Sequence, residues 1–231
     1  MNNFNNYGFV FDMDGTLVDN MNHHSKAWGK LLKENGKDMD LDNFLKRTAG
    51  KTSREIIPEV FGDISDDEIT RIADRKEELY REEYLPDRKP VAGLVEFLAE
   101  AKRLGIKMAV ATAGPTPNMK FILDGLDLRQ YFDAITTSGD IKKGKPDPEI
   151  FLMSAKKLGV EPAHCMVFED AIGGFEAANN AGMKSIGIAT VNPVEEIMEK
   201  PSVVEAHPDF TEMDPLRLVE TYLAGGRAQG A

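Results

Sequence analysis

The sequence contains a single cysteine, Cys165, among 231 residues. One cysteine excludes an intrachain disulfide and is typical of a protein from a reducing compartment. No apolar run approaches the roughly 20 residues that a membrane-spanning helix needs, so we expect no membrane contact. The polar segment 1–6 also lacks the apolar stretch of a signal peptide. We therefore expect a cytoplasmic protein.

An excess of positive charge is also missing. The chain has 28 lysines and arginines against 39 aspartates and glutamates, for a formal net charge of −11. A negative surface is repelled by a phosphate backbone, so we do not expect nucleic acid as a partner. Hydrophobic residues make up 42% of the chain and charged residues 29%, as in ordinary globular proteins. The length allows one large domain or a domain with an insertion.

The order of strand-like and helical segments divides the chain in two. Residues 22–90 are polar and helical, with no strand-like run, whereas strands and helices alternate after residue 91. Alternation of this kind predicts a doubly wound, Rossmann-like α/β fold, with a parallel sheet and helices on both faces. We expect a core domain at 1–20 and 88–231 and a helical cap domain at 21–87. The expected core strands lie at 9–11, 106–112, 133–138, 165–168 and 184–188, and the core helices at 94–104, 118–126, 148–158 and 172–181.

The segment Phe9–Thr16 predicts a short buried strand followed by a loop that carries two carboxylates. In extended backbone, positions i and i+2 face the same way, so Asp12 and Asp14 can look into one pocket while Met13 points away. Gly15 allows a sharp turn directly after them. The same pattern can also simply end a strand, since aspartate and glycine are common in turns. The rest of the chain must decide between these alternatives.

Polar residues also follow other predicted strands. Thr112 ends the second strand, Glu169–Asp170 ends a later one, and Lys145 lies in a loop on the same expected edge of the sheet. The carboxyl ends of parallel strands near the switch point form a ligand crevice. Carboxylates crowded there either take up protons or bind a cation, and oxygen ligands without histidine or cysteine favour Mg²⁺. A carboxylate nucleophile, Mg²⁺, a lysine and a hydroxyl are typical of phosphoryl transfer.

These four motifs, in this order, resemble those of the haloacid dehalogenase superfamily, and the helical insertion resembles the cap of its β-phosphoglucomutase-like branch. The resemblance implies that Asp12 attacks phosphorus to form an aspartyl-phosphate. It implies that Asp14 protonates the leaving oxygen and then activates water or a hydroxyl, while Thr112 and Lys145 hold phosphoryl oxygens. The implied Mg²⁺ ligands are the Asp12 side chain, the Asp14 main-chain carbonyl and Glu169–Asp170.

Three residues of the helical segment are candidates for substrate binding. His24 lies early on the first helix, where the resembling mutases also carry a histidine, and we expect it to close over the substrate; the alternative is a solvated histidine on the helix surface. Arg54 follows a turn at a helix start, which suits an anion, but can instead pair with a nearby acid. The resemblance places a substrate-facing lysine at Lys76, which can also belong to a salt-bridged helix surface.

The loop after the second strand departs from the mutases. They carry a second hydroxyl and a lysine where this chain has Gly114 and Pro115, and those groups help to hold the second phosphate of their substrate. Ala113 and Asn118 of this loop are further candidates for substrate binding. The loss of two donors disfavours a mutase, because a mutase must hold a bisphosphate, whereas hydrolysis needs only water.

We therefore predict a monomeric, Mg²⁺-dependent phosphatase of small phosphorylated metabolites, with sugar phosphates as the expected substrates. The first alternative is a β-phosphoglucomutase-type sugar phosphomutase. A pyrophosphate or nucleotide phosphatase is a further alternative, because the motifs recognise the phosphoryl group and not the leaving group. A non-catalytic sugar-phosphate sensor is a third alternative, disfavoured by the presence of Asp12, Asp14 and Lys145.

Overall fold

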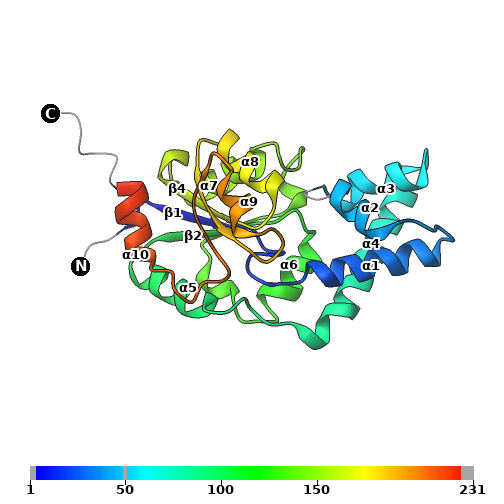
Figure 1. Cartoon of the computed structure of the whole chain (residues 1–231), viewed down its shortest axis with the longest axis horizontal. Coiled ribbons are helices and arrows are strands. Elements are labelled where there is room, and N and C mark those ends of the chain that lie inside the picture. The colour runs from blue at the N-terminus through cyan, green and yellow to red at the C-terminus, as the bar shows by residue number, and fades with distance from the viewer. Residues whose placement is uncertain (1–3, 49–50, 225–231) are drawn as a thin grey trace.

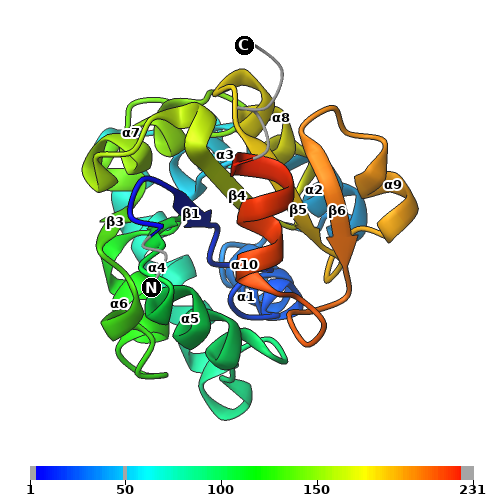
Figure 2. The same ribbon diagram turned by 90° about the vertical axis from the view of Figure 1, so that its left-hand side faces the viewer.

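The computed structural model describes residues 4–48 and 51–224, and its centre is a six-stranded parallel sheet. The order across the sheet is β3-β2-β1-β4-β5-β6. Strand β1 therefore lies near the middle of the sheet (Figures 1 and 2). Its apolar residues are buried, because helices cover both faces of the sheet. The strands are β1 (Gly8–Phe11), β2 (Lys107–Ala111), β3 (Ala134–Thr136), β4 (Cys165–Glu169), β5 (Lys184–Ile188) and β6 (Val203–His207).

The strand order reverses between β1 and β4. The chain moves outward from β1 through β2 to β3 and then crosses back to place β4 on the other side of β1. Phe11 is in register with Phe168, and the Asp12 amide donates to the Phe168 carbonyl at 2.9 Å. This register brings the carboxyl ends of the two strands together, which is where ligands bind in open α/β sheets.

Side chains alternate between the two faces of the sheet, and helices cover both. Phe9, Phe11 and Phe168 belong to one cluster, with residues of α5 and α6. Val10 and Val167 belong to the other cluster, with residues of α7 and α8. Both faces are therefore dry, as expected for a parallel sheet. The helices of the core are α5 (Leu94–Arg103), α6 (Thr116–Leu123), α7 (Glu149–Leu158), α8 (Ile172–Asn180), α9 (Val194–Met198) and α10 (Pro215–Leu218).

Four of the α-helices between β1 and β2, those that precede α5, lie together at one end of the molecule (Figure 1). They are α1 (Met21–Glu34), α2 (Leu41–Thr48), α3 (Ser53–Phe61) and α4 (Asp66–Tyr84). Helices α3 and α4 each begin with a complete capping box, at Thr52 with Glu55 and at Ser65 with Glu68. Such reciprocal hydrogen bonds satisfy two otherwise free amide groups at each helix start. We call these four helices the helical insertion.

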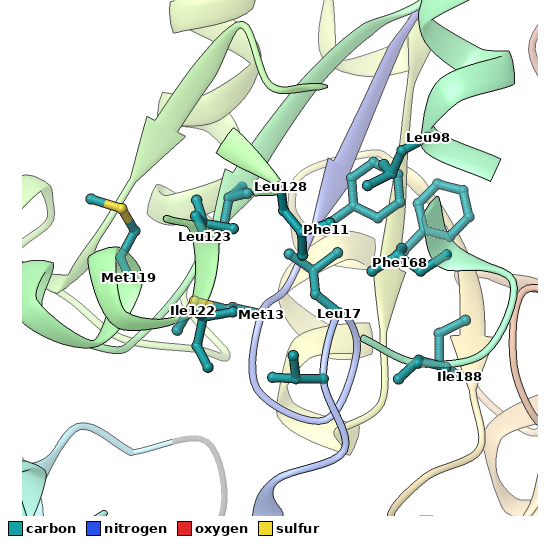
Figure 3. Packing of buried hydrophobic residues seen from close by; sticks show 14 of the residues in the cluster. Phe11, Met13, Leu17, Leu98, Met119, Ile122, Leu123, Leu128, Phe168 and Ile188 are labelled. Carbon is teal, nitrogen blue, oxygen red and sulfur yellow. The ribbon is translucent and has the colours of Figure 1, made fainter. Parts of the chain in front are cut away.

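The packing around β1 fixes the loop that follows it. Met13 is fully buried and points into the apolar cluster beside Ile122, while the Phe11 and Phe168 rings stack with centroids 4.4 Å apart (Figure 3). Leu17 is also fully buried in this cluster. Because Met13 and Leu17 are anchored in the core, the residues between and beside them have little freedom. The loop after β1 is therefore held rigidly on the core side.

The predicted fold class, a doubly wound parallel sheet with helices on both faces, is confirmed, and each of the five expected strands is present. Strand β6, helices α9 and α10 and the π-helix at Val219–Ala224 were not predicted. In β6 all five residues are only partly buried, so the apolar pattern that marks an inner strand is missing. Helix α6 begins at Thr116 and ends at Leu123, earlier than expected. Among the described residues, no helix is long and apolar enough to cross a membrane.

Candidate active site

Three buried carboxylates meet at the carboxyl ends of β1 and β4. Asp12 follows β1, Glu169 ends β4 and Asp170 follows it, and one oxygen from each lies within 4.8 Å of the others. Their exposed fractions are 6%, 0% and 2%. Like charges at such distances repel strongly when water is excluded, so this group requires a proton or a cation.

Lys145 is the cation that the chain itself supplies to this group. It lies in the loop before α7, is 9% exposed, and donates from Nζ to Asp12 Oδ1 at 2.6 Å and to Glu169 Oε1. Burial alone would lower the pKa of Lys145, but Asp12 and Glu169 hold that pKa above its usual value, so the lysine is charged. The Lys145 ammonium and the Asp12 carboxylate therefore form a buried, charge-assisted hydrogen bond.

One lysine does not balance three carboxylates. Burial, opposed by Lys145 and assisted by Glu169 and Asp14, raises the pKa of Asp12 to about 8. Burial and the charges of Glu169 and Asp12 likewise raise the pKa of Asp170. The carboxylates thus fit a bound divalent cation, because such a cation would supply the charge that the protein lacks here.

Two glycines make room for these carboxylates. Gly15 has a φ of +88°, and a Cβ built on it would lie 2.2 Å from Asp170 Oδ2. A Cβ on Gly174 of α8 would lie 1.8 Å from Glu169 Oε1. Either contact is far inside van der Waals distance, so a side chain at these positions would displace a carboxylate. The glycines are therefore part of the architecture of the site.

Asp14 has different neighbours from Asp12, although only Met13 separates them. Asn20 Nδ2 donates to Asp14 Oδ1 at 2.6 Å, Thr112 Oγ1 approaches Asp14 Oδ2 at 3.5 Å, and His24 Nε2 lies 3.4 Å from Asp14 Oδ1. Burial alone would raise the pKa of Asp14, but His24, Asn20 and Lys76 together hold that pKa below its usual value. The two aspartates of one loop therefore have pKa values shifted in opposite directions.

The helical insertion reaches Asp14 through His24. The His24 ring stacks on Tyr80 with centroids 3.8 Å apart, and His24 Nδ1 lies 2.8 Å from Lys76 Nζ. Lys76 is 4% exposed and also contacts Glu77 Oε1 at 3.1 Å. The predicted residues His24 and Lys76 thus lie at the same site as Asp14.

Arg54 lies elsewhere. Its Nη2 donates to Thr70 Oγ1 at 3.0 Å, and its side chain is exposed. The expectation that Arg54 binds an anion of the substrate stays a prediction, without a recorded contact to the carboxylates.

The loop after β2 contributes two predicted residues. Ala113 is partly buried, and a Cβ built on its neighbour Gly114 would lie 3.5 Å from Asp14 Oδ2, so this loop borders the site. Asn118 is fully buried, and its amide bonds to two residues of α4, Glu77 and Arg81. The roles predicted for Ala113 and Asn118 in substrate binding stay predictions.

Sequence reasoning missed two residues that shape the site, Asn20 and Glu77. Asn20 accepts a hydrogen bond from the Gly15 amide at 3.2 Å and donates to Asp14 and to the Tyr80 hydroxyl. Glu77 is a buried carboxylate that bonds Asn118 across the two parts of the molecule. Only the position of Asn20 directly before α1 offered a signal, and that position usually indicates a helix cap.

Comparison with known proteins supplies the family. The model of haloacid dehalogenase-like hydrolases matches residues 8–182 of this chain. The chain belongs to this family. The match covers β1 to β4, helix α8, the helical insertion and every predicted site residue. The family resemblance is therefore confirmed, and the chain is a hydrolase of the haloacid dehalogenase type.

Individual relatives agree with this assignment. A fructose-1-phosphate phosphatase of Escherichia coli is 33% identical over 183 residues, which cover 78% of this chain and 95% of the relative. A phosphorylated carbohydrates phosphatase of Thermotoga maritima is 32% identical over 203 residues, covering 87% and 94%. The solved structure of a β-phosphoglucomutase from Clostridium difficile is 30% identical, covers 94% of this chain and 96% of its own, and superposes with a TM-score of 0.81.

Proposed function

We propose that this protein is a Mg²⁺-dependent phosphatase that hydrolyses phosphate monoesters of small sugars through an aspartyl-phosphate on Asp12. One observation carries the proposal: two aspartates of one loop have separate partners. Asp12 contacts the buried Lys145 ammonium and the acidic group, whereas Asp14 contacts Asn20, Thr112 and His24. Two carboxylates of one loop that are held by separate sets of partners suit two different roles.

Asp12 is the nucleophile in this proposal. Its carboxylate oxygen attacks phosphorus and forms an O–P bond while the bond between phosphorus and the sugar oxygen breaks. The packing of β1 and the Lys145 ammonium hold this carboxylate in place, which reduces the entropy cost of the attack. Lys145 and Thr112 also offer a cation and a hydroxyl to the phosphoryl oxygens as charge shifts during the transfer.

Asp14 is the general acid and base. It gives a proton to the departing sugar oxygen in the first step, and in the second it takes one from the water that attacks phosphorus, which returns Asp12 as a free carboxylate. Asn20 and His24 hold the Asp14 carboxylate in place for both steps. The proton therefore returns to its starting point at the end of each cycle.

Asp12, Glu169 and Asp170, with the Asp14 carbonyl, are the proposed ligands of Mg²⁺. When bound, the ion supplies positive charge to the phosphoryl group and to the carboxylates. The raised pKa values of Asp12 and Asp170 support this assignment, since a bound divalent cation would stabilise the charged form of these crowded carboxylates. Glu169 has a second task, because its Oε2 accepts from the Asp170 and Ala171 amides.

A sugar phosphomutase is the second candidate, favoured by the similarity to the β-phosphoglucomutase structure and by the contact of His24 with Asp14. Gly114 and Pro115 argue against it, because neither side chain offers a donor for a second phosphate. The relatives named as phosphatases of carbohydrates favour hydrolysis of a sugar phosphate. A pyrophosphate or nucleotide phosphatase would use the same core residues.

The test is phosphate release from a panel of hexose and hexitol phosphates, a nucleotide and pyrophosphate, with Mg²⁺ or with EDTA. We expect Mg²⁺-dependent release from sugar monophosphates, and we expect Asp12→Asn to lower kcat/KM by about 10⁴-fold. Asp19→Asn, an exposed aspartate near the same loop, is the matched control and leaves kcat/KM unchanged.

Three results would contradict the proposal. Undiminished turnover by Asp12→Asn would exclude the covalent mechanism. Rapid isomerisation of a hexose 1-phosphate in the presence of trace bisphosphate, without phosphate release, would identify a mutase. Preference for pyrophosphate or the nucleotide over every sugar phosphate would replace the substrate class.

A further inference from the structure

A buried carboxylate lies where the helical insertion meets the core. Glu77 of α4 is 7% exposed. It is distinct from the proposed nucleophile Asp12, from the acid/base Asp14 and from the acidic group of the core. Lys76 Nζ lies 3.1 and 3.2 Å from its two oxygens, and Ser53 Oγ donates to Oε1 at 2.7 Å. A buried charge with this many donors is held in one orientation, since leaving any of them unpaired is costly.

Glu77 also bonds the loop region that follows β2. Asn118 Nδ2, at the start of α6, donates to Glu77 Oε2 at 2.6 Å. Arg81 Nη1 donates to the Asn118 amide oxygen at 2.7 Å. This bond orients the amide so that its NH₂ group faces the Glu77 carboxylate. One N–H of this NH₂ group is therefore committed to Glu77, and the amide is held in one orientation.

Two side chains, Lys76 and His24, link the Glu77 carboxylate to the acid/base Asp14. The Lys76 ammonium that it contacts is 2.8 Å from His24 Nδ1, and His24 Nε2 is 3.4 Å from Asp14. Burial alone would raise the pKa of Glu77, but Lys76, His24 and the hydrogen bonds from Ser53 and Asn118 hold it below its usual value. Glu77 therefore carries a negative charge at neutral pH.

We propose that Glu77 is a specificity-determining residue that admits sugar monophosphates and rejects substrates with a second phosphate. This inference rests on the proposed function. The donors that would hold a second anionic group beside the acid/base, Lys76 Nζ and the Asn118 amide, are already bound to the Glu77 carboxylate. A second phosphate in this place meets a like charge in a water-poor region, whereas a neutral sugar hydroxyl can accept from or donate to the same groups.

The loop after β2 adds to the effect. Gly114 and Pro115 have no side-chain donor, and Gly114 lies beside Asp14. Two features therefore disfavour a substrate with a second phosphate: the missing donors of this loop and the negative charge of Glu77. Only the second can be removed by a change that keeps the size of the side chain.

The test compares kcat/KM for fructose 1-phosphate and fructose 1,6-bisphosphate with Mg²⁺, in the full chain. We expect the natural protein to prefer the monophosphate at least tenfold, and Glu77→Gln to reduce this preference at least tenfold, chiefly through a lower KM for the bisphosphate. Glu77→Asn, a second neutral variant, shifts the ratio in the same direction. Glu78→Gln, an exposed neighbour on the same helix, leaves the ratio unchanged.

Calorimetry separates this proposal from the proposed function. The Kd of each sugar phosphate is measured in Asp12→Asn and in the double variant with Glu77→Gln, where no turnover is needed. Loss of the monophosphate preference in binding supports the role of Glu77 even if the natural protein releases no phosphate, a result that would overturn only the proposed phosphatase. An unchanged ratio of Kd and of kcat/KM in folded Glu77→Gln and Glu77→Asn would overturn the role of Glu77.

Discussion

The core edge of the site and the helical insertion position their side chains in different ways. At the core edge, Asp12, Glu169 and Asp170 come from the ends of two strands in register, and their backbones belong to or directly follow the sheet. In the insertion, His24, Lys76 and Glu77 project from helices that contact the core mainly through side chains, such as Glu77 with Asn118. The first arrangement resists displacement, and the second can vary without disturbing the sheet.

This difference separates chemistry from selection. The nucleophile and the acidic group lie at the ends of sheet strands and Lys145 reaches them from the loop before α7, so a change of the strand backbone there would cost buried apolar area. The residues proposed to choose the substrate lie on the insertion, where a substitution alters only local hydrogen bonds. We therefore expect the largest losses of activity from the core edge and smaller, substrate-dependent changes from the insertion.

Of the variants in this comparison, Lys145→Met should lower the activity most. Lys145→Met removes the ammonium that bonds Asp12 and Glu169, so phosphoryl oxygens lose a cation and the carboxylates lose their partner. We expect kcat/KM for a sugar monophosphate to fall about 10³-fold.

Lys143→Met, an exposed lysine of the same loop, is the control and should retain the natural rate. Circular dichroism with Mg²⁺ present establishes that Lys145→Met is folded. A folded Lys145→Met protein with kcat/KM within tenfold of the natural value would remove Lys145 from the proposed mechanism.

The same contrast explains what the sequence could predict. The site at the core edge was predictable because β1, β2 and β4 are neighbours, so polar residues after three apolar runs must meet at one edge. Lys145 followed from the family motif. These inferences need the positions of the strands, which hydrophobic patterns indicate, and their parallel direction, which follows from the alternation of strands and helices.

The insertion was less predictable, because its contacts join residues far apart in sequence. Glu77 and Asn118 are separated by 41 positions and bond across two helices of different parts, which no local pattern indicates. Arg54 has the same sequence context whether it binds an anion or, as here, the Thr70 hydroxyl on the surface. Side chains on helices are placed by the packing of the helices, and short sequence patterns do not specify that packing.

Replacing Lys76 tests how much a residue of the helical insertion contributes to the reaction, compared with Lys145. Lys76→Met removes the ammonium beside His24 and leaves the buried Glu77 carboxylate without its cation, so the positions of His24 and Asp14 loosen. We expect kcat/KM for a sugar monophosphate to fall roughly 10- to 100-fold, less than for Lys145→Met.

Arg75→Met, the neighbouring exposed arginine paired with Glu34, serves as the control for this helix. It should stay within threefold of the natural kcat/KM. If Lys76→Met lowered the rate as much as Lys145→Met, the division between a chemical core and a selecting insertion would be wrong.

The smallest expected effect tests whether the core edge is as rigid as its packing indicates. In Gly174→Ala the new Cβ would lie 1.8 Å from Glu169 Oε1, so Glu169 must move away from Lys145 or helix α8 must shift. We expect a loss of about 1–3 kcal/mol in the free energy of unfolding and weaker Mg²⁺ binding. Gly173→Ala, one residue earlier on the same helix, meets nothing within 4 Å and should be neutral or stabilising by up to about 1 kcal/mol. Urea unfolding and Mg²⁺ titration of the two variants measure the difference. Equal stability and equal Mg²⁺ affinity would show that the acidic group can move to accommodate an added methyl group. The geometry of the group would then not be fixed by the sheet.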